Sequence, residues 1–233
     1  MYSQHQTEAS VTLEPAVAAN AAVIWLHGLG ADGFDFVPIV PELGLPRTLP
    51  VRFIFPHASA RPVTINNGYV MRAWYDIRGI SRSAAEDEQG IRESQSRIAA
   101  LIDAQERTGV PAERIVIAGF SQGGAIALQT ALRYPQALAG VLALSTYLPL
   151  QQTLVQEAAA ANRRIPILMC HGVRDPVVPA QLGEFSRQSL NDLGYAVDWR
   201  TYPMEHSVCP AEIADLGRWL QQVLPTNAIP NQG

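Results

Sequence analysis

The chain has 233 residues, of which 48% are hydrophobic, and a formal net charge of −4. This length and composition suffice to bury a full core, so we expect a single domain over residues 1–233. All 17 basic residues are arginines, which excludes a Schiff-base lysine, a Ser-Lys dyad and a P-loop lysine. The acidic balance also argues against a nucleic-acid partner.

The sequence shows no targeting or membrane-spanning signal. No stretch approaches the ~20 apolar residues of a membrane span, and no basic segment precedes a short apolar one as in a signal peptide. We therefore expect a cytoplasmic protein. The polar or proline-containing ends, residues 1–20 and 225–233, are expected to be frayed.

Apolar runs alternate with helical patterns along the chain. The expected strands are at 23–27, 52–55, 114–118, 139–144, 165–170 and 197–202. The expected helices are at 88–108, 122–134, 179–193 and 210–224. Continuous apolar strands that alternate with helices predict an α/β fold with a mostly parallel sheet covered on both faces.

The first of these strands ends in a His-Gly-x-Gly turn at residues 27–30. Glycines at positions 28 and 30 let the backbone approach a substrate oxygen, which makes the Leu29 N–H a candidate oxyanion donor. The alternatives are a flexible loop before a helix or a phosphate cradle. Neither known phosphate-binding glycine motif is present at this position.

A long connection between His57 and Glu88 carries Trp74, Tyr75 and Ile77. Long loops in compact domains are usually functional or disordered. An aromatic loop at a sheet edge fits the wall of an acyl pocket. The alternative is that Trp74 belongs to the core, where aromatic side chains dominate burial.

Residues 119–123 read Gly-Phe-Ser-Gln-Gly between a β-branched run and an alanine-rich run. This is the pattern of a nucleophile elbow, which makes Ser121 the candidate nucleophile and the Gln122 N–H a candidate oxyanion donor. The alternative is a glycine-rich turn in which the serine caps a helix.

An activated serine needs a base and an orienting carboxylate. Asp175 follows the strand expected at 165–170, and His206 follows the strand expected at 197–202. Both would leave the same edge of a parallel sheet as Ser121, in the chain order Ser, Asp, His. Taken singly, Asp175 could form a turn and His206 could cap the next helix.

Seven segments in this order resemble the phospholipase/carboxylesterase and acyl-protein thioesterase family of α/β-hydrolases. They are His27–Gly33, Arg72–Ile77, Glu86–Ile91, Gly119–Gly124, Leu144–Pro149, His171–Pro176 and Tyr202–Ser207. The resemblance implies an α/β-hydrolase fold, a triad of Ser121, Asp175 and His206, and oxyanion donors at Leu29 and Gln122. It also implies an acyl-pocket role for Trp74, and we expect Ile77, Leu29 and Val178 to contact substrate as well. Short insertions elsewhere in the sequence leave little room for a separate lid domain, which favours an open site suited to short or medium acyl chains.

Two positions depart from the family pattern. The family usually has glycine where Glu205 precedes the histidine, and often an apolar residue where Arg78 follows Ile77. A guanidinium near the groove mouth disfavours burial of a long tail. We therefore expect a preference for short to medium acyl chains.

The cysteines and histidines give no sign of a metal or cofactor site. Cys170 and Cys209 show no C-x-x-C spacing, so reduced thiols are expected, with Cys170 in the core and Cys209 partly exposed. The histidines at 27, 57, 171 and 206 have no recognised ligand spacing. No cofactor and no metal are expected.

The residues together predict a serine hydrolase that cleaves carboxylic esters, or thioesters, through an acyl-enzyme. Its partner would be a small-molecule ester or an acylated substrate. The sequence does not decide whether the protein forms a homo-oligomer. The alternatives are a serine aminopeptidase or acyltransferase with the same triad, and a non-catalytic binding protein on a hydrolase fold.

Overall fold

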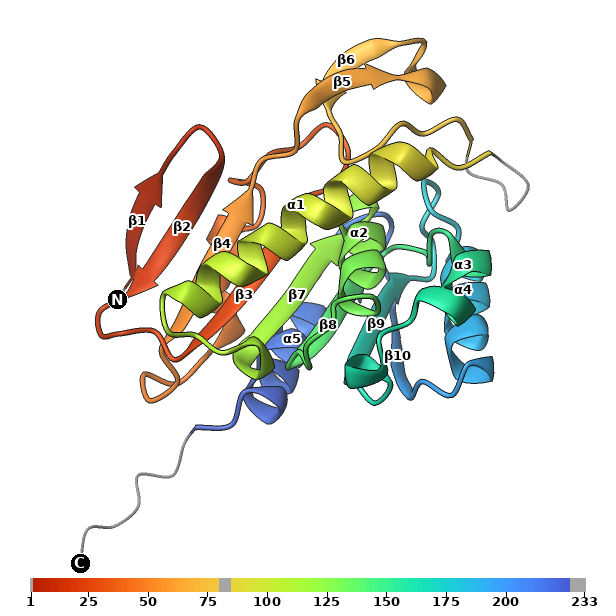
Figure 1. Ribbon diagram of the computed structural model, residues 1–233. Helices are drawn as coiled ribbons and strands as arrows, with labels where there is room; N and C mark the ends of the chain where they lie inside the picture. Colours follow the sequence, from red (N-terminus) through yellow and green to blue (C-terminus); the bar gives the residue numbers. More distant parts are fainter. Residues whose placement is uncertain (1, 80–84, 227–233) are drawn as a thin grey trace, which may run out of the picture.

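A computed structural model describes residues 2–79 and 85–226. In this part of the chain, eight strands form one sheet in the order β1-β2-β4-β3-β7-β8-β9-β10 (Figure 1). The strands are β1 (Tyr2–Gln6), β2 (Ser10–Pro15), β3 (Ala21–Leu26), β4 (Val51–Pro56), β7 (Ile115–Phe120), β8 (Gly140–Leu144), β9 (Ile167–Gly172) and β10 (Val197–Tyr202). Strands β4, β3, β7, β8, β9 and β10 pair in parallel, and β1 and β2 are antiparallel additions at one edge.

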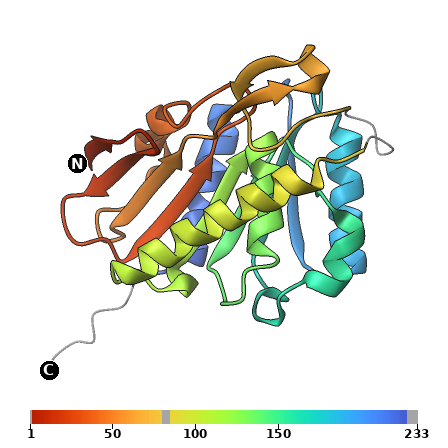
Figure 2. The same ribbon diagram turned by 45° about the horizontal axis from the view of Figure 1, so that its top comes forward.

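Helices cover both faces of the sheet, as the sequence predicts (Figure 2). The helices are α1 (Glu88–Arg107), α2 (Gln122–Ala131), α3 (Gln151–Glu157), α4 (Ala180–Asp192) and α5 (Pro210–Val223), with 3₁₀ turns η1 (Val37–Leu43), η2 (Thr64–Asn66), η3 (Ala112–Arg114) and η4 (Ala160–Asn162). Helices α1, α2, α3 and α4 contribute to one core cluster, whereas α5 and η1 contribute to the other. Both faces of the sheet are therefore covered by helices and buried.

Strand β3 shows why the parallel strands are apolar throughout. Ala22, Ile24 and Leu26 belong to the core under α1 and α2, and Val23 and Trp25 belong to the core under α5. Successive side chains of a strand point to opposite faces. A strand covered on both sides must therefore be apolar at every position.

The expectation of a frayed N-terminus is wrong. Residues 2–6 and 10–15 form the antiparallel pair β1–β2, and β2 pairs with β4. Val11 and Leu13 are buried, and Tyr2 packs edge-on against Phe53. Only two apolar residues alternate with polar ones in this segment, and so short a pattern does not predict a strand from the sequence. Of the C-terminal segment 225–233, residues 227–233 lie outside the described part of the chain.

A second hairpin rises above the carboxyl edge of the sheet (Figure 1). It consists of β5 (Ala60–Val63) and β6 (Tyr69–Arg72), which pair antiparallel. The segment from residue 73 to 79 then returns to the sheet edge. Within residues 2–79 and 85–226, no helix is long and apolar enough to cross a bilayer.

Candidate active site

Ser121 lies at a strained turn between β7 and α2. Its backbone has φ 54° and ψ −120°, which a residue with a Cβ adopts at a cost. The turn is fixed by a bond from the Ser121 N–H to the Leu144 carbonyl (2.8 Å) and by one from the Thr146 hydroxyl to the Ser121 carbonyl (2.6 Å). A Cβ on Gly123 would overlap the Leu26 and His27 carbonyls. Glycine there lets α2 begin directly above β3.

The three predicted polar side chains form one hydrogen-bonded chain. Ser121 Oγ lies 2.9 Å from His206 Nε2, and His206 Nδ1 lies 2.7 Å from Asp175 Oδ2. An ionised carboxylate only accepts, so the proton of a neutral His206 sits on Nδ1 and Nε2 is left to accept from the serine hydroxyl. This is the protonation pattern that a general base requires.

Asp175 is held by the backbone that follows it. Its Oδ1 accepts from the N–H groups of Val177 (2.9 Å) and Val178 (2.8 Å), and its side chain is fully buried. Both acceptor directions of Oδ1 are thus occupied by fixed donors. The carboxylate orients the imidazole without rotating.

Glu205, which stands where the family usually has glycine, is exposed. Its carbonyl accepts from the Ser207 N–H (2.9 Å) and packs against Gly172, where a Cβ would overlap it. The backbone on either side of His206 is therefore fixed by main-chain contacts. Packing at this position does not involve the Glu205 carboxylate.

Within the described part of the chain, two of the residues that line the cavity at Ser121 carry backbone N–H groups without a protein acceptor. Gln122 is the first residue of α2, so its N–H has no acceptor within the helix. Among the described residues, no protein oxygen accepts from the Leu29 N–H. Leu29, Gln122, Ser121 and His206 line the same cavity. The two donors are available to an oxyanion.

Two neutral histidines fix the loop around Leu29. Burial lowers the pKa of His27 to about 4. Its Nε2 accepts from the Ala58 N–H (3.0 Å), so its Nδ1 carries the proton and donates to the Gly28 carbonyl (2.7 Å). His57 Nδ1 accepts from the Gly33 N–H (2.9 Å), and burial lowers its pKa as well. Neither histidine lies near a set of groups that could hold a metal; within the described residues no such set exists.

The cavity at Ser121 has a volume of about 400 Å³, within the range of small-molecule sites. Of the expected substrate contacts, Leu29, Ile77 and Val178 line it. The remaining lining residues are Gly28, Ala31, Asp35, Ile65, Asn66, Tyr75, Gly79, Phe120, Ser121, Gln122, Tyr147, Val177 and His206. Phe120 also packs against the His206 ring, with centroids 4.7 Å apart.

The expectation that Trp74 walls this cavity is wrong. Trp74 is 1% exposed and belongs to the core cluster under α1 and α2. Its indole N–H donates to the His27 carbonyl (2.9 Å), and Arg97 lies over its ring. The large apolar ring is buried because the core lies directly beneath the loop, and the next residue, Tyr75, takes the wall position.

Gln122 has a second role that the motif did not reveal. Its side-chain oxygen accepts from the Trp74 N–H (2.8 Å), and its amide donates to the Tyr75 carbonyl (2.7 Å). The side chain thus pins the segment that walls the cavity to the first turn of α2. The only signal in the sequence is a polar residue directly after the nucleophile, and its burial is visible only in the structure.

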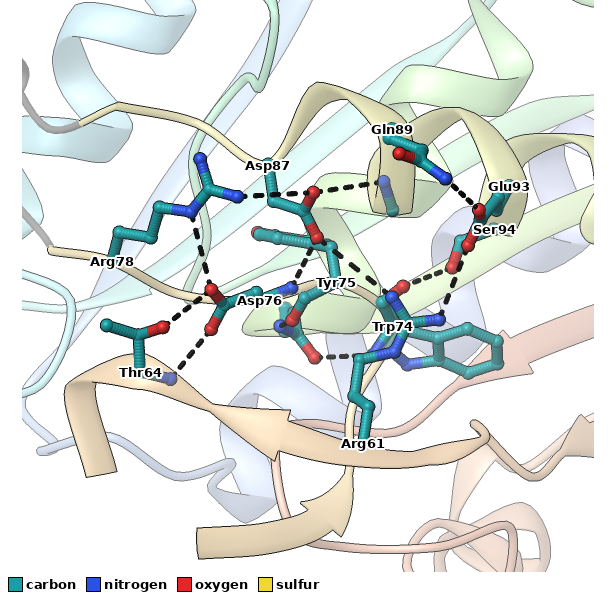
Figure 3. A network of polar contacts seen from close by, with 12 residues as sticks. Arg61, Thr64, Trp74, Tyr75, Asp76, Arg78, Asp87, Gln89, Glu93 and Ser94 are labelled. Carbon is teal, nitrogen blue, oxygen red and sulfur yellow. Dashed lines mark hydrogen bonds and ion pairs between the residues drawn. The ribbon is translucent and has the colours of Figure 1, made fainter. Parts of the chain in front are cut away.

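Figure 3 shows how acidic groups hold the rest of this segment. The Asp76 N–H donates to Asp87 (2.8 Å), whose carboxylate also caps α1 through the Gly90 N–H (3.2 Å). Asp76 in turn accepts from the N–H and the hydroxyl of Thr64, both at 2.7 Å. The segment is therefore tied to α1 on one side and to the β5–β6 hairpin on the other.

Arg78 does not reach the cavity at Ser121. Its guanidinium lies 3.4 Å from Asp76 and 3.9 Å from Asp87, and it lines a neighbouring cavity instead. The carboxylates that hold the segment attract the guanidinium away from the nucleophile. Arg78 therefore does not line the groove at Ser121, and the expectation that its guanidinium limits the acyl chain there is wrong.

The two cysteines are free, as expected. Cys170 is buried in β9, where burial raises the pKa of its thiol. Cys209 is partly buried directly before α5. Neither thiol lines the cavity at Ser121.

The sequence matches the family model described as phospholipase/carboxylesterase over residues 7–224. Acyl-protein thioesterase 1 of Neurospora crassa is 43% identical over 223 residues, which cover 91% of this chain and 91% of that protein. Acyl-protein thioesterase 1 of Cryptococcus neoformans var. neoformans is 39% identical over 231 residues, covering 91% of this chain and 96% of the relative.

Solved structures give the same relationship. Arabidopsis thaliana SOBER1 superposes with a TM-score of 0.84 at 31% identity, covering 88% of this chain and 100% of that one. Zea mays acyl-protein thioesterase 2 superposes with a TM-score of 0.82 at 30% identity, covering 92% and 98%.

Proposed function

Because the chain belongs to the phospholipase/carboxylesterase family and is an α/β-hydrolase of esters or thioesters, we propose that Ser121, His206 and Asp175 are its catalytic triad. The observation that carries this proposal is the hydrogen-bonded chain from Ser121 Oγ through His206 to Asp175. The order Ser, Asp, His in the sequence and the position of the three residues at the carboxyl edge of the sheet are those of the nucleophile, acid and base of this fold.

In the proposed reaction, Ser121 Oγ attacks the acyl carbonyl while His206 Nε2 takes the hydroxyl proton. The Leu29 and Gln122 N–H groups stabilise the oxyanion of the tetrahedral intermediate. His206 then returns the proton to the leaving alcohol or thiol, and the acyl-enzyme forms. Water repeats the sequence with His206 again as the base, which releases the acid and the free serine.

Short to medium acyl chains are the proposed substrates. The support comes from the cavity of about 400 Å³, whose lining includes Leu29, Ile77 and Val178. Two relatives are named acyl-protein thioesterases, so acylated thiols belong in the substrate panel beside oxygen esters. Both pass through the same kind of tetrahedral intermediate.

Labelling with a fluorophosphonate tests the assignment of the nucleophile. The wild-type protein should form a stoichiometric adduct, and peptide mass spectrometry should place it on Ser121. The matched control is Ser145→Ala, which removes a buried serine at the end of the adjacent strand and should label normally. A protein that stays unlabelled would be a binding protein on this fold, and hydrolysis of peptide amides but not esters would indicate an aminopeptidase.

A further inference from the structure

A second cavity of about 330 Å³ lies beside the one that contains Ser121. Four residues line both cavities: Tyr75, Ile77, Gly79 and Tyr147. Residues shared by two linings form the wall between them. Away from this wall, the second cavity has a mixed lining of apolar residues, Ala85, Leu148, Leu182 and Phe185, and polar ones, Asp76, Arg78, Glu86, Gln151, Gln152 and Ser186.

The wall is closed by a bond between two tyrosines that are far apart in the sequence. The hydroxyls of Tyr75 and Tyr147 lie 2.9 Å apart. Burial raises the pKa of both phenols, so each keeps its proton at neutral pH and one donates to the other. The pair joins the segment that follows β6 to the loop that follows β8.

Both tyrosines are fixed by their neighbours. On one side, Gln122 and Asp87 bind the backbone before and after Tyr75. On the other, the Leu148 N–H donates to Ser186 Oγ (2.8 Å), and the Leu150 N–H donates to the Glu86 carboxylate (3.1 Å). The hydrogen bond between the two hydroxyls therefore joins two loops that are each held by further hydrogen bonds, and these bonds resist displacement of the wall.

The tyrosine pair belongs to the lining of the Ser121 cavity itself. Ile77 and the two tyrosines line both cavities, whereas apolar residues such as Leu29 and Val178 line only the first. An acyl chain that extends from Ser121 and fills the first cavity therefore meets the tyrosine pair.

We propose that the Tyr75–Tyr147 pair is the partition that ends the acyl site and sets the longest chain the enzyme accepts. This inference rests on the proposed hydrolase function. The second cavity is unused space in the wild-type enzyme, and it becomes an extension of the acyl site when the partition is removed.

The test is a panel of p-nitrophenyl esters from acetyl to dodecanoyl, read as the ratio of kcat/KM for dodecanoyl over butanoyl. Tyr147→Ala removes half of the partition. Each methylene group that gains an apolar environment contributes about three- to four-fold, so the ratio should rise by at least ~10-fold. If circular dichroism shows that this variant does not fold, Tyr147→Leu makes the same comparison with a smaller loss of volume.

The matched control fills the second cavity. Leu182 lines only that cavity, so Leu182→Trp alone should leave the chain-length profile as in the wild type. In the Tyr147→Ala background, the same substitution should return the ratio towards the wild-type value. This non-additivity separates an opened partition from a general loosening of the site.

Two outcomes contradict the partition. One is an active Tyr147→Ala enzyme whose dodecanoyl-to-butanoyl ratio equals that of the wild type. The other is a changed chain-length profile in Leu182→Trp alone, which would mean that the wild type already uses the second cavity. Failure of the proposed function gives a different result. A wild-type protein that cleaves no ester and takes no fluorophosphonate label would contradict both the hydrolase function and the partition.

Discussion

Ser121, His206 and Asp175 could be proposed as a triad from the sequence because each depends on a local pattern. The elbow needs only the five residues around Ser121, and the other two residues follow recognisable strands. The side chains of Gln122 and Trp74 could not be assigned in this way. Their partners are 47 or 48 positions away in the chain, and only the folded structure brings them together.

Gln122→Ala tests the positioning role of this side chain, since it keeps the backbone N–H that we propose as an oxyanion donor. The Trp74 N–H and the Tyr75 carbonyl lose their partner, and a buried unpaired group costs about 1–3 kcal/mol. We expect kcat/KM for short esters to fall by at least ~10-fold, which corresponds to about 1.4 kcal/mol.

The control for this prediction is Gln129→Ala in the same helix. Gln129 is also buried, but its amide donates to Gln95, away from the site. It should lower the free energy of unfolding without changing kcat/KM. Equal kinetic losses in the two variants would show that Gln122 acts only through stability.

At the scale of elements, the strands that are buried on both faces and the long helices were the predictable ones. The six expected strands correspond to β3, β4, β7, β8, β9 and β10, and the four expected helices to α1, α2, α4 and α5. The short pieces were missed. Strands β5 and β6 have mostly exposed or half-buried side chains, so they carry no period-2 apolar pattern, and α3 has only 7 residues.

Helix α5 contains a buried acid that makes the stability depend on pH. Glu212 in its first turn is 0% exposed, and burial raises the pKa of its carboxyl from 4.5 to about 8. Between these two values the folded state binds a proton that the unfolded state has released. The contribution of Glu212 to stability is therefore complete at low pH and is lost as the pH rises to about 8.

Glu212→Gln stays neutral at every pH and removes this dependence. Its free energy of unfolding should match that of the wild type near pH 4 and exceed it at pH 9, by on the order of a few kcal/mol. Urea denaturation at several pH values measures the difference. A difference between Glu212→Gln and the wild type that does not vary with pH would contradict the assignment.

At the scale of the whole molecule, the parallel sheet gathers the site. Strands β3, β7, β9 and β10 run in the same direction, so the residues that follow them meet at one edge, although they span positions 29 to 206. This convergence follows from strand order and could be predicted. The shape of the cavity could not, because it depends on how one segment, residues 73 to 79, is anchored to α1, α2 and the β5–β6 hairpin.

The central claim is that Ser121 is the nucleophile, and the steady-state kinetics of Ser121→Ala test it most directly. The substitution removes Oγ and leaves the oxyanion donors and the cavity in place. We expect kcat for p-nitrophenyl butanoate to fall by at least ~10³-fold, with only the contribution of binding and oxyanion stabilisation remaining, while the circular dichroism spectrum stays that of the wild type. A folded Ser121→Ala protein that retains more than about a tenth of the wild-type kcat would contradict the claim.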